Sequence, residues 1–315
     1  MFRKSSIICA VVAMTLLMTS CGIPGKNDSE KEGTLDDGNY SFSEIETGII
    51  VTSMNSDMSG DILYILGVDE SDSSKTVMKT IDTKTFECSD FEQILVFDST
   101  QSIHGFYPCA DGYWVHASDS EDNAGSLYYL SEDFELISEF DVNDYADGGS
   151  YQIWDSTADG HLLISLGNTE LFTLSPEGEK VQIWNMTSLA EVTTRDFYRA
   201  AVLENGIYCF NQNDDSMQAV KFRTNGEDGV EEHYLLPSLY NNCFVGEDGR
   251  IYLADGECNL YVINEGGELE FLFGLSEIKW RSMLSGLSVL GEDEYLALFD
   301  SKIYSITKTK NPEDI

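Results

Sequence analysis

Residues 248–274 read DGRIYLADGECNLYVINEGGELEFLFG and show most clearly how this chain folds. The stretch begins with an Asp-Gly pair, which favours a tight turn because glycine adopts positive φ at little cost. Three short apolar and aromatic runs follow, RIYLAD, NLYVIN and LEFLFG, with turn residues between them. Such runs between Gly, Asp and Asn are typical of antiparallel strands. The stretch therefore predicts a small antiparallel sheet.

The same unit recurs along the chain. Turn pairs followed at once by a strand-like run stand at Ser59-Gly60, Asp111-Gly112, Asp159-Gly160, Asn205-Gly206, Asp248-Gly249 and Glu292-Asp293. Successive pairs are 52, 48, 46, 43 and 44 residues apart, and each unit has a second strand-like run. Four short antiparallel strands in units of this length form the blades of a β-propeller, because one blade cannot bury both its faces whereas a closed ring of blades can.

The repeats predict an all-β protein with six blades of four antiparallel strands. Seven blades are the nearer alternative, and a β-sandwich with accidental spacing is the other. The sixth unit ends at Lys308 without an outer strand, so we expect residues 40–45 to supply that strand and close the ring. Aromatic residues follow most of the turns, and we expect them to pack between blades; they are Tyr64, Trp114, Tyr208, Tyr252 and Tyr295.

The unit at residues 248–274 resembles the NHL-type propeller repeat. In that repeat an Asp-Gly pair precedes a Tyr-Val-Ala-Asp-like strand and an asparagine precedes the next strand, as Asp248-Gly249, Tyr252 and Asn259 do here. The other units share this pattern only in outline. The resemblance implies a six-bladed ring, in agreement with the six turns.

A signal sequence precedes the repeats. It begins with Arg3 and Lys4, continues with an apolar run over residues 7–18, and ends with Thr19-Ser20 before Cys21. This order is typical of secretory signals, and the apolar run is too short to span a bilayer comfortably. The segment before Cys21 resembles the lipobox of bacterial lipoproteins, with Met18 in place of leucine. The resemblance implies cleavage before Cys21 and a lipid anchor on its thiol; a plain signal peptide with an incidental cysteine is the alternative.

The chain thus divides into four parts. Residues 1–20 form the signal, residues 21–39 a tether, residues 40–308 the propeller and residues 309–315 a polar, linker-like tail. The tether has hardly any apolar residue, so it could not bury enough surface to offset the entropy of ordering, and we expect it to be flexible.

The charge of the chain excludes two kinds of partner. After removal of the signal, 16 basic residues face 56 acidic ones. Such a field repels nucleic acid and anionic lipid head groups, so neither is expected as a broad partner.

Neither cysteines nor histidines form a recognisable chemical motif. Five cysteines follow Cys21 without the spacing of metal ligands: Cys88, Cys109, Cys209, Cys243 and Cys258. The sequence leaves undecided whether Cys243 and Cys258 form a disulfide. Only one of the four histidines, His104, falls on an expected innermost strand, and no catalytic or nucleotide-binding motif occurs. We therefore expect no metal, no cofactor and no enzymatic activity.

The repeat spacing points to one set of candidate binding residues. Eight residues before each turn stand Thr52, His104, Gln152, Tyr198, Asn241 and Ser285, all polar. In a propeller this place lies near the start of the innermost strand. A polar channel mouth occurs in any propeller, so a wet lining is the alternative interpretation. The binding candidates, called the rim residues below, are His104, Gln152, Tyr198, Arg199, Asn241 and Asn242.

The order of signal, tether, propeller and tail resembles the front part of solute-binding lipoproteins of anaerobic Gram-positive bacteria. The resemblance implies a non-catalytic, membrane-anchored module outside the cytoplasm, accessory to solute uptake, next to a solute-binding domain or an ABC permease. Its ligand would be a small molecule, a glycan or a protein. A cell-surface scaffold is one alternative, and a propeller lyase or hydrolase is the other.

Overall fold

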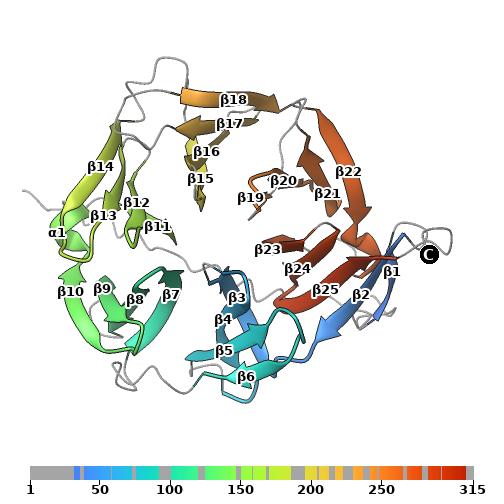
Figure 1. The fold of residues 1–315 in the computed structure, drawn as a ribbon, viewed down its shortest axis with the longest axis horizontal. Helices are drawn as coiled ribbons and strands as arrows, with labels where there is room; N and C mark the ends of the chain where they lie inside the picture. Colours follow the sequence, from blue (N-terminus) through green and yellow to red (C-terminus); the bar gives the residue numbers. More distant parts are fainter. Residues whose placement is uncertain are drawn as a thin grey trace, which may run out of the picture.

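The computed structural model describes residues 32–35, 39–57, 59–72, 76–91, 101–119, 125–146, 150–157, 159–167, 170–185, 196–203, 206–212, 217–222, 230–236, 242–246, 248–264, 268–278, 283–291 and 293–309. Within these, six antiparallel sheets stand around a common axis (Figure 1). The innermost strands of neighbouring sheets contact each other all the way round, so the sheets form one closed ring.

Five of the sheets are four-stranded blades, numbered here along the chain. Blades 1 and 2 consist of β3 (Ile49–Ser56), β4 (Ile62–Asp69), β5 (Thr76–Asp82) and β6 (Cys88–Asp90), then β7 (Gln101–Cys109), β8 (Gly112–Asp119), β9 (Gly125–Ser131) and β10 (Leu136–Asp141). Blade 3 consists of β11 (Tyr151–Ser156), β12 (Leu162–Leu166), β13 (Glu170–Leu174) and β14 (Lys180–Asn185). Blades 4 and 5 consist of β15 (Asp196–Leu203), β16 (Gly206–Gln212), β17 (Met217–Phe222) and β18 (Val230–Leu236), then β19 (Asn242–Val245), β20 (Ile251–Ala254), β21 (Asn259–Ile263) and β22 (Leu269–Gly274).

The remaining strands form the sixth sheet, called the closing sheet below. From the axis outward it runs β23 (Leu284–Gly291), β24 (Glu294–Phe299), β25 (Lys302–Lys308), β2 (Tyr40–Ile45) and β1 (Glu32–Leu35). The prediction of six blades of four strands each is therefore wrong, as is the seven-blade alternative. The structure has five blades of four strands, and the strands left over from both ends of the chain combine into a single five-stranded sheet.

The two ends of the chain meet in the closing sheet, as expected from the missing outer strand of the last unit. Strand β2 pairs antiparallel with β25 over its whole length, from Tyr40 opposite Lys308 to Ile45 opposite Ile303. The predicted closure by residues 40–45 is confirmed. The expected tether differs in part, because β1 extends the sheet beyond β2 and buries Leu35 completely; the rest of residues 21–39, apart from Asn39, lies outside the described residues.

The repeated turns lie where the spacing places them, between the first and second strands of each sheet. Three share one backbone pattern, in which Gly60, Gly160 and Gly249 each donate an N–H to the carbonyl three residues earlier. The φ angles of these glycines are 73°, 85° and 78°, a region that other residues adopt only with strain. This conformational need explains why a turn pair ending in glycine recurs in the sequence.

The aromatic residues that follow the turns are buried as expected. Tyr64, Trp114, Tyr208, Tyr252 and Tyr295 are at most 7% exposed and belong to the clusters that fill the spaces between sheets. Between blade 5 and the closing sheet, for example, the Tyr295 ring lies 5.4 Å from that of Phe273. Among the described residues the core is thus a set of apolar layers between neighbouring sheets.

Two short helices complete the described part of the chain. They are α1 (Asn143–Ala146), which follows β10, and the 3₁₀ turn η2 (Leu275–Glu277), which follows β22. None of the helices among the described residues has the length and apolar character that crossing a membrane requires. All five described cysteines are free, so the Cys243–Cys258 bridge left open by the sequence does not form.

Closure can be tested on Phe42 of β2. Its side chain is 4% exposed and its ring lies 6.2 Å from that of Tyr304. Phe42→Ala should lower the free energy of unfolding by about 3–5 kcal/mol, because it leaves a cavity between the closing sheet and its neighbour. Ser43→Ala, at an exposed position on the same strand, should change it by less than about 0.5 kcal/mol. Equal midpoints for the two variants in urea unfolding would show that β2 does not hold the ring.

Candidate functional site

The rim residues lie on or near the innermost strands, but at different places within them. His104, Gln152, Tyr198 and Arg199 lie on β7, β11 and β15, and Asn242 begins β19. The side chains of Tyr198 and Arg199 and the whole of Asn241 lie outside the described part of the chain, as does Cys21. The structure therefore describes the side-chain surroundings of His104, Gln152 and Asn242 and not those of the other rim residues.

A β-bulge interrupts the innermost strand of five sheets. The residues left out of the pairing are Thr52, His104, Trp154, Tyr198 and Ser285. Four of these are positions that the spacing singles out as polar, which means that the repeat spacing locates the bulge. Among the five sheets that have this bulge, blade 3 alone departs from the spacing, because its bulge falls at Trp154, two residues after Gln152.

The bulge gives a structural reason for a polar side chain at this position. A bulge leaves a backbone group of the neighbouring strand without its ladder partner. The Thr52 hydroxyl donates to the Leu66 carbonyl at 3.1 Å, and the Ser285 hydroxyl donates to the Leu298 carbonyl at 3.2 Å. Leu66 and Leu298 take equivalent places opposite their bulges. The hydroxyls of Thr52 and Ser285 thus supply hydrogen bonds to backbone carbonyls at the place where the bulge interrupts the strand pairing.

Other polar side chains of the inner strands join neighbouring sheets. The Asn55 amide donates to the Phe106 carbonyl of blade 2 at 2.8 Å, and the Ser56 and Ser288 hydroxyls share a hydrogen bond of 2.9 Å between blade 1 and the closing sheet. The Asn242 amide donates to the Leu284 carbonyl of the closing sheet. Asn242 therefore has a hydrogen-bond partner within the fold, whereas exposed Gln152 makes no side-chain hydrogen bond among the described residues.

His104 belongs to a cluster that the sequence did not reveal. Its Nε2 lies 2.6 Å from the Ser118 hydroxyl, and its ring centre lies 5.2 Å from that of His116 on β8. His116 Nε2 in turn lies 3.1 Å from the Tyr151 hydroxyl on β11, so the cluster bridges blades 2 and 3. Gly125 makes room for this bridge, because a Cβ there would stand 2.3 Å from His116 Nε2.

The protonation of this cluster follows from its burial. Burial lowers the pKa of His116 to about 4, and the neighbouring His104 adds to the shift. Burial also lowers the pKa of His104 and raises the pKa of Tyr151. At neutral pH both imidazoles are therefore neutral and the phenol keeps its proton. An imidazole this weakly basic is suited to holding the two blades together and poorly suited to abstracting a proton.

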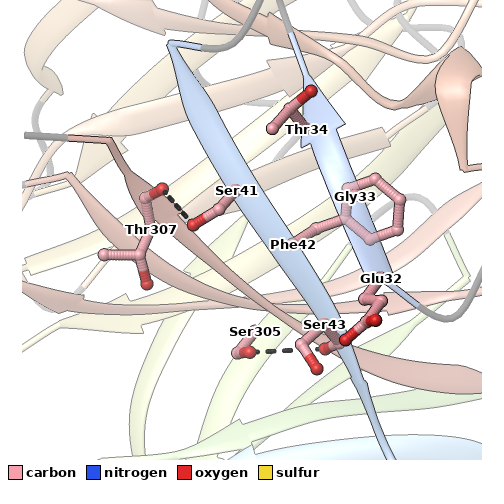
Figure 2. A pocket seen from close by; sticks show the side chains of 8 residues that line it. All are labelled: Glu32, Gly33, Thr34, Ser41, Phe42, Ser43, Ser305 and Thr307. Atoms are coloured by element: carbon pink, nitrogen blue, oxygen red, sulfur yellow. Dashed lines mark hydrogen bonds between the residues drawn. The ribbon is translucent and has the colours of Figure 1, made fainter.

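A shallow hollow lies elsewhere, on the outer part of the closing sheet (Figure 2). It encloses about 500 Å³ and is lined by two cross-strand rows, Glu32–Ser43–Ser305 and Thr34–Ser41–Thr307, with Gly33 and Phe42. The Ser41 and Ser305 hydroxyls donate to carbonyls of the neighbouring strand at 3.3 Å each. These hydroxyls thus form hydrogen bonds within the sheet, and the hollow is open and lined mostly by polar side chains.

No metal centre is assembled by the side chains described. Among residues 32–309, excluding the gaps given above, no three His, Cys, Asp or Glu side chains are grouped so as to hold a metal ion. His104 and His116 lie side by side, but their Nε2 atoms each face a hydroxyl.

Comparison with known proteins identifies the fold. No protein-family model matches the sequence. No curated protein sequence matches it either. Among solved structures, YCF48 from Cyanidioschyzon merolae aligns with a TM-score of 0.54 at 10% identity, covering 84% of this chain and 98% of that one. The oligogalacturonate lyase from Vibrio parahaemolyticus aligns with a TM-score of 0.54 at 11% identity, covering 88% and 96%.

A third structure, YCF48 bound to a D1 peptide, aligns with a TM-score of 0.52 at 11% identity and covers 89% of this chain and all of that one. One of these proteins is a lyase by name and another holds a peptide, so the shared architecture serves different functions. At such low identity the similarity shows the fold alone, a β-propeller.

The inter-sheet role of Asn242 predicts a stability effect. Asn242→Ala removes the amide that bonds to the Leu284 carbonyl, so the free energy of unfolding should fall by about 1–3 kcal/mol. Gln152→Ala, at a rim position without such a bond, should change it by less than about 0.5 kcal/mol. Urea unfolding of both variants compares them; a neutral Asn242→Ala would show that this bond does not hold the two sheets together.

The His116 pKa predicts a pH dependence of stability. An unfolded histidine titrates near pH 6.5, whereas folded His116 titrates near pH 4, so the unfolded state binds more protons between these values. Stability should hold above about pH 6.5 and fall as the pH drops toward 4. His116→Gln keeps a hydrogen-bonding group beside Tyr151 but cannot titrate, and its stability should fall less over the same range. Parallel curves of melting temperature against pH for the two proteins would contradict this assignment.

Proposed function

We propose that this protein is an exported lipoprotein whose propeller is a non-catalytic module that binds a protein partner. The signal sequence and the lipobox-like segment before Cys21 support export and anchoring. The propeller fold supports a binding role in a general way, since it serves partner-binding proteins among the structures compared above.

Large apolar side chains exposed on outer strands carry this proposal. On β10, Leu136 and Ile137 are 47% and 57% exposed, and on β14, Val181 and Ile183 are 49% and 53% exposed. Outer strands of a propeller face solvent, where polar side chains would serve solubility better. Aliphatic side chains that stay exposed on two successive blades favour a contact surface for another protein. By contrast, the inner-strand hydroxyl and amide groups described above are used within the fold.

The anchor would keep this module close to the membrane. The described fold begins at Glu32 of β1, eleven residues after Cys21. A fully extended chain spans at most about 3.5 Å per residue, so the outer edge of the closing sheet would lie within about 40 Å of the lipid. A propeller on so short a connection suits a partner at the same membrane surface.

Two finer roles follow from the kind of partner. A solute-binding domain or an ABC permease as partner would make the protein an accessory of solute uptake, whereas another surface protein as partner would make it a scaffold. Identifying the cross-linked protein in the experiment below separates these roles. The oligogalacturonate lyase shares only its fold with this chain, so it does not favour a lyase or hydrolase role.

Anchoring and binding can be tested separately in cells. Cys21→Ala should abolish incorporation of an alkyne-labelled fatty acid and release the protein from membranes, because no thiol remains to be acylated. Unchanged labelling and membrane retention in this variant would contradict the lipid anchor.

For binding, a photo-cross-linking amino acid replaces Ile183 in one chain and Ile62, which is 37% exposed on blade 1, in the matched control. Irradiation should link position 183 to a protein of discrete mass and should not link position 62. The same amino acid placed at position 137 or 181 tests the rest of this surface. If positions 137, 181 and 183 all give no adduct, the protein does not bind a partner through it.

A further inference from the structure

Blades 2 and 3 differ in charge from the rest of the ring. Between Lys84 and Lys180 the sequence contains twenty Asp and Glu residues and not one Lys or Arg. This stretch runs from the end of blade 1 to the start of β14, so it supplies all of blade 2 and three strands of blade 3. Blade 2 and the first three strands of blade 3 therefore contain no permanently positive side chain.

Several basic side chains of the described residues are engaged by nearby carboxylates. Lys79 lies 3.0 Å from Asp90 and Lys84 lies 2.8 Å from Asp61 in blade 1, and Lys302 lies 3.0 Å from Glu44 in the closing sheet. In blade 3, Lys180 lies 2.7 Å from Glu170 and 4.2 Å from the centre of the Phe172 ring. The only lysine of blades 2 and 3 is thus already engaged within its own sheet.

The exposed apolar side chains of β10 and β14 lie within this acidic part, whereas others, such as Ile62 on blade 1 and Phe271 on blade 5, lie outside it. On β10 and its preceding turn, Leu136 and Ile137 are flanked by exposed Glu132, Asp133, Glu135 and Glu139. Before β14, Glu177 and Glu179 precede Val181 and Ile183. The charges around these aliphatic side chains are acidic except for Lys180, which is paired with Glu170, whereas ordinary solvated surface mixes both signs.

The outer strands of the two blades belong to one surface. The Ser138 hydroxyl of β10 donates to the Pro176 carbonyl, in the turn before β14, at 2.7 Å. The Phe140 ring lies against Gly178 of the same turn, where a Cβ would come within 2.5 Å of it. We call β10, the turn at residues 176–179 and β14 the acidic edge. It lies on the side of the ring away from β1 and β2 (Figure 1).

We propose that the acidic edge binds a partner segment that presents lysine or arginine around branched aliphatic side chains. This inference rests on the proposed protein-binding function and names the chemistry of the partner. Aliphatic contact supplies affinity at about 25 cal/mol per Å² of apolar surface removed from water, while opposite charge raises the association rate and excludes acidic competitors.

The charge pattern also selects against other occupants. A second copy of this chain would bring two acidic edges together, and the net charge of −38 makes such pairing repulsive. Anionic lipid and nucleic acid are repelled for the same reason. Because the edge lies on the side of the ring away from β1, where the proposed anchoring segment would join the fold, that segment leaves the edge open to a partner.

Synthetic peptides can serve as probes with the purified full chain. The main probe is a fluorescein-labelled twelve-residue peptide of alternating Lys and Ile; the comparison peptides alternate Glu with Ile and Lys with Ser. Binding is followed by fluorescence anisotropy at low and high salt. The Lys–Ile peptide should bind at least about tenfold more tightly than either comparison peptide, and its affinity should fall with added salt because the charges are screened.

Substitutions locate the binding. Ile137→Ser with Ile183→Ser should weaken Lys–Ile binding about tenfold or more, and Glu135→Gln with Glu139→Gln should weaken it several-fold and flatten its salt dependence. Matched controls carry Ile62→Ser, or Glu257→Gln with Glu268→Gln on blade 5, and should bind as the unaltered chain does. Melting curves establish that each variant is folded.

Three results would overturn the inference: unchanged binding by the acidic-edge variants, equal weakening by the controls, or equal binding of the Lys–Ser peptide. The last would indicate general attraction between opposite charges. Should the peptide ignore the acidic edge while position 183 still cross-links to a protein in cells, the partner chemistry is wrong and the binding function stands. Loss of both signals would remove the binding function as well.

Discussion

Pairing between β2 and β25 is the constraint on which the rest of the structure depends. A ring of sheets buries its apolar layers only when it closes, and here the strand that closes it comes from the opposite end of the chain. Without β2, strand β25 would be an unprotected edge, and the layer containing Tyr40 and Phe42 would open to water. With it, both ends of the propeller lie in one sheet.

Closure also decides where function can reside. The innermost strands hold the ring together, so their polar side chains are drawn into bulges and inter-sheet bonds, as Thr52, Ser285 and Asn242 show. The outer strands contribute less to ring closure than the innermost strands do. Those of blades 2 and 3 expose aliphatic side chains among carboxylates. The same division explains why the His116–Tyr151 contact is better understood as a bridge between blades than as a catalytic pair.

Much of the fold could be predicted because it repeats. The glycine turns near residues 60, 160 and 249 and the strands after them are recognisable from their residue pairs and apolar runs, and the missing outer strand points to residues 40–45. Strand β1 was not foreseen, since EGTL has one strongly apolar residue and Leu35 becomes buried only when the closing sheet exists. The even division into four-stranded blades failed for that reason.

The candidate site was predictable in position but not in meaning. Counting back from each turn found the polar residues at four of the five bulges, yet a sequence does not show that a hydroxyl such as that of Thr52 meets a carbonyl on the adjacent strand. The His116 contact escaped because its partner, Tyr151, belongs to the next blade. Charge segregation between Lys84 and Lys180 is visible in the sequence, but its significance depends on knowing which strands face outward.

Hydrogen exchange measured by mass spectrometry tests the closure of the ring most directly. If β2 is an integral part of the closing sheet, its amides should exchange as slowly as those of β24 and β25, through a common cooperative opening. Fast exchange of residues 40–45 beside protected β24 and β25 would mean that the ring stands without its N-terminal strand, and would contradict this account.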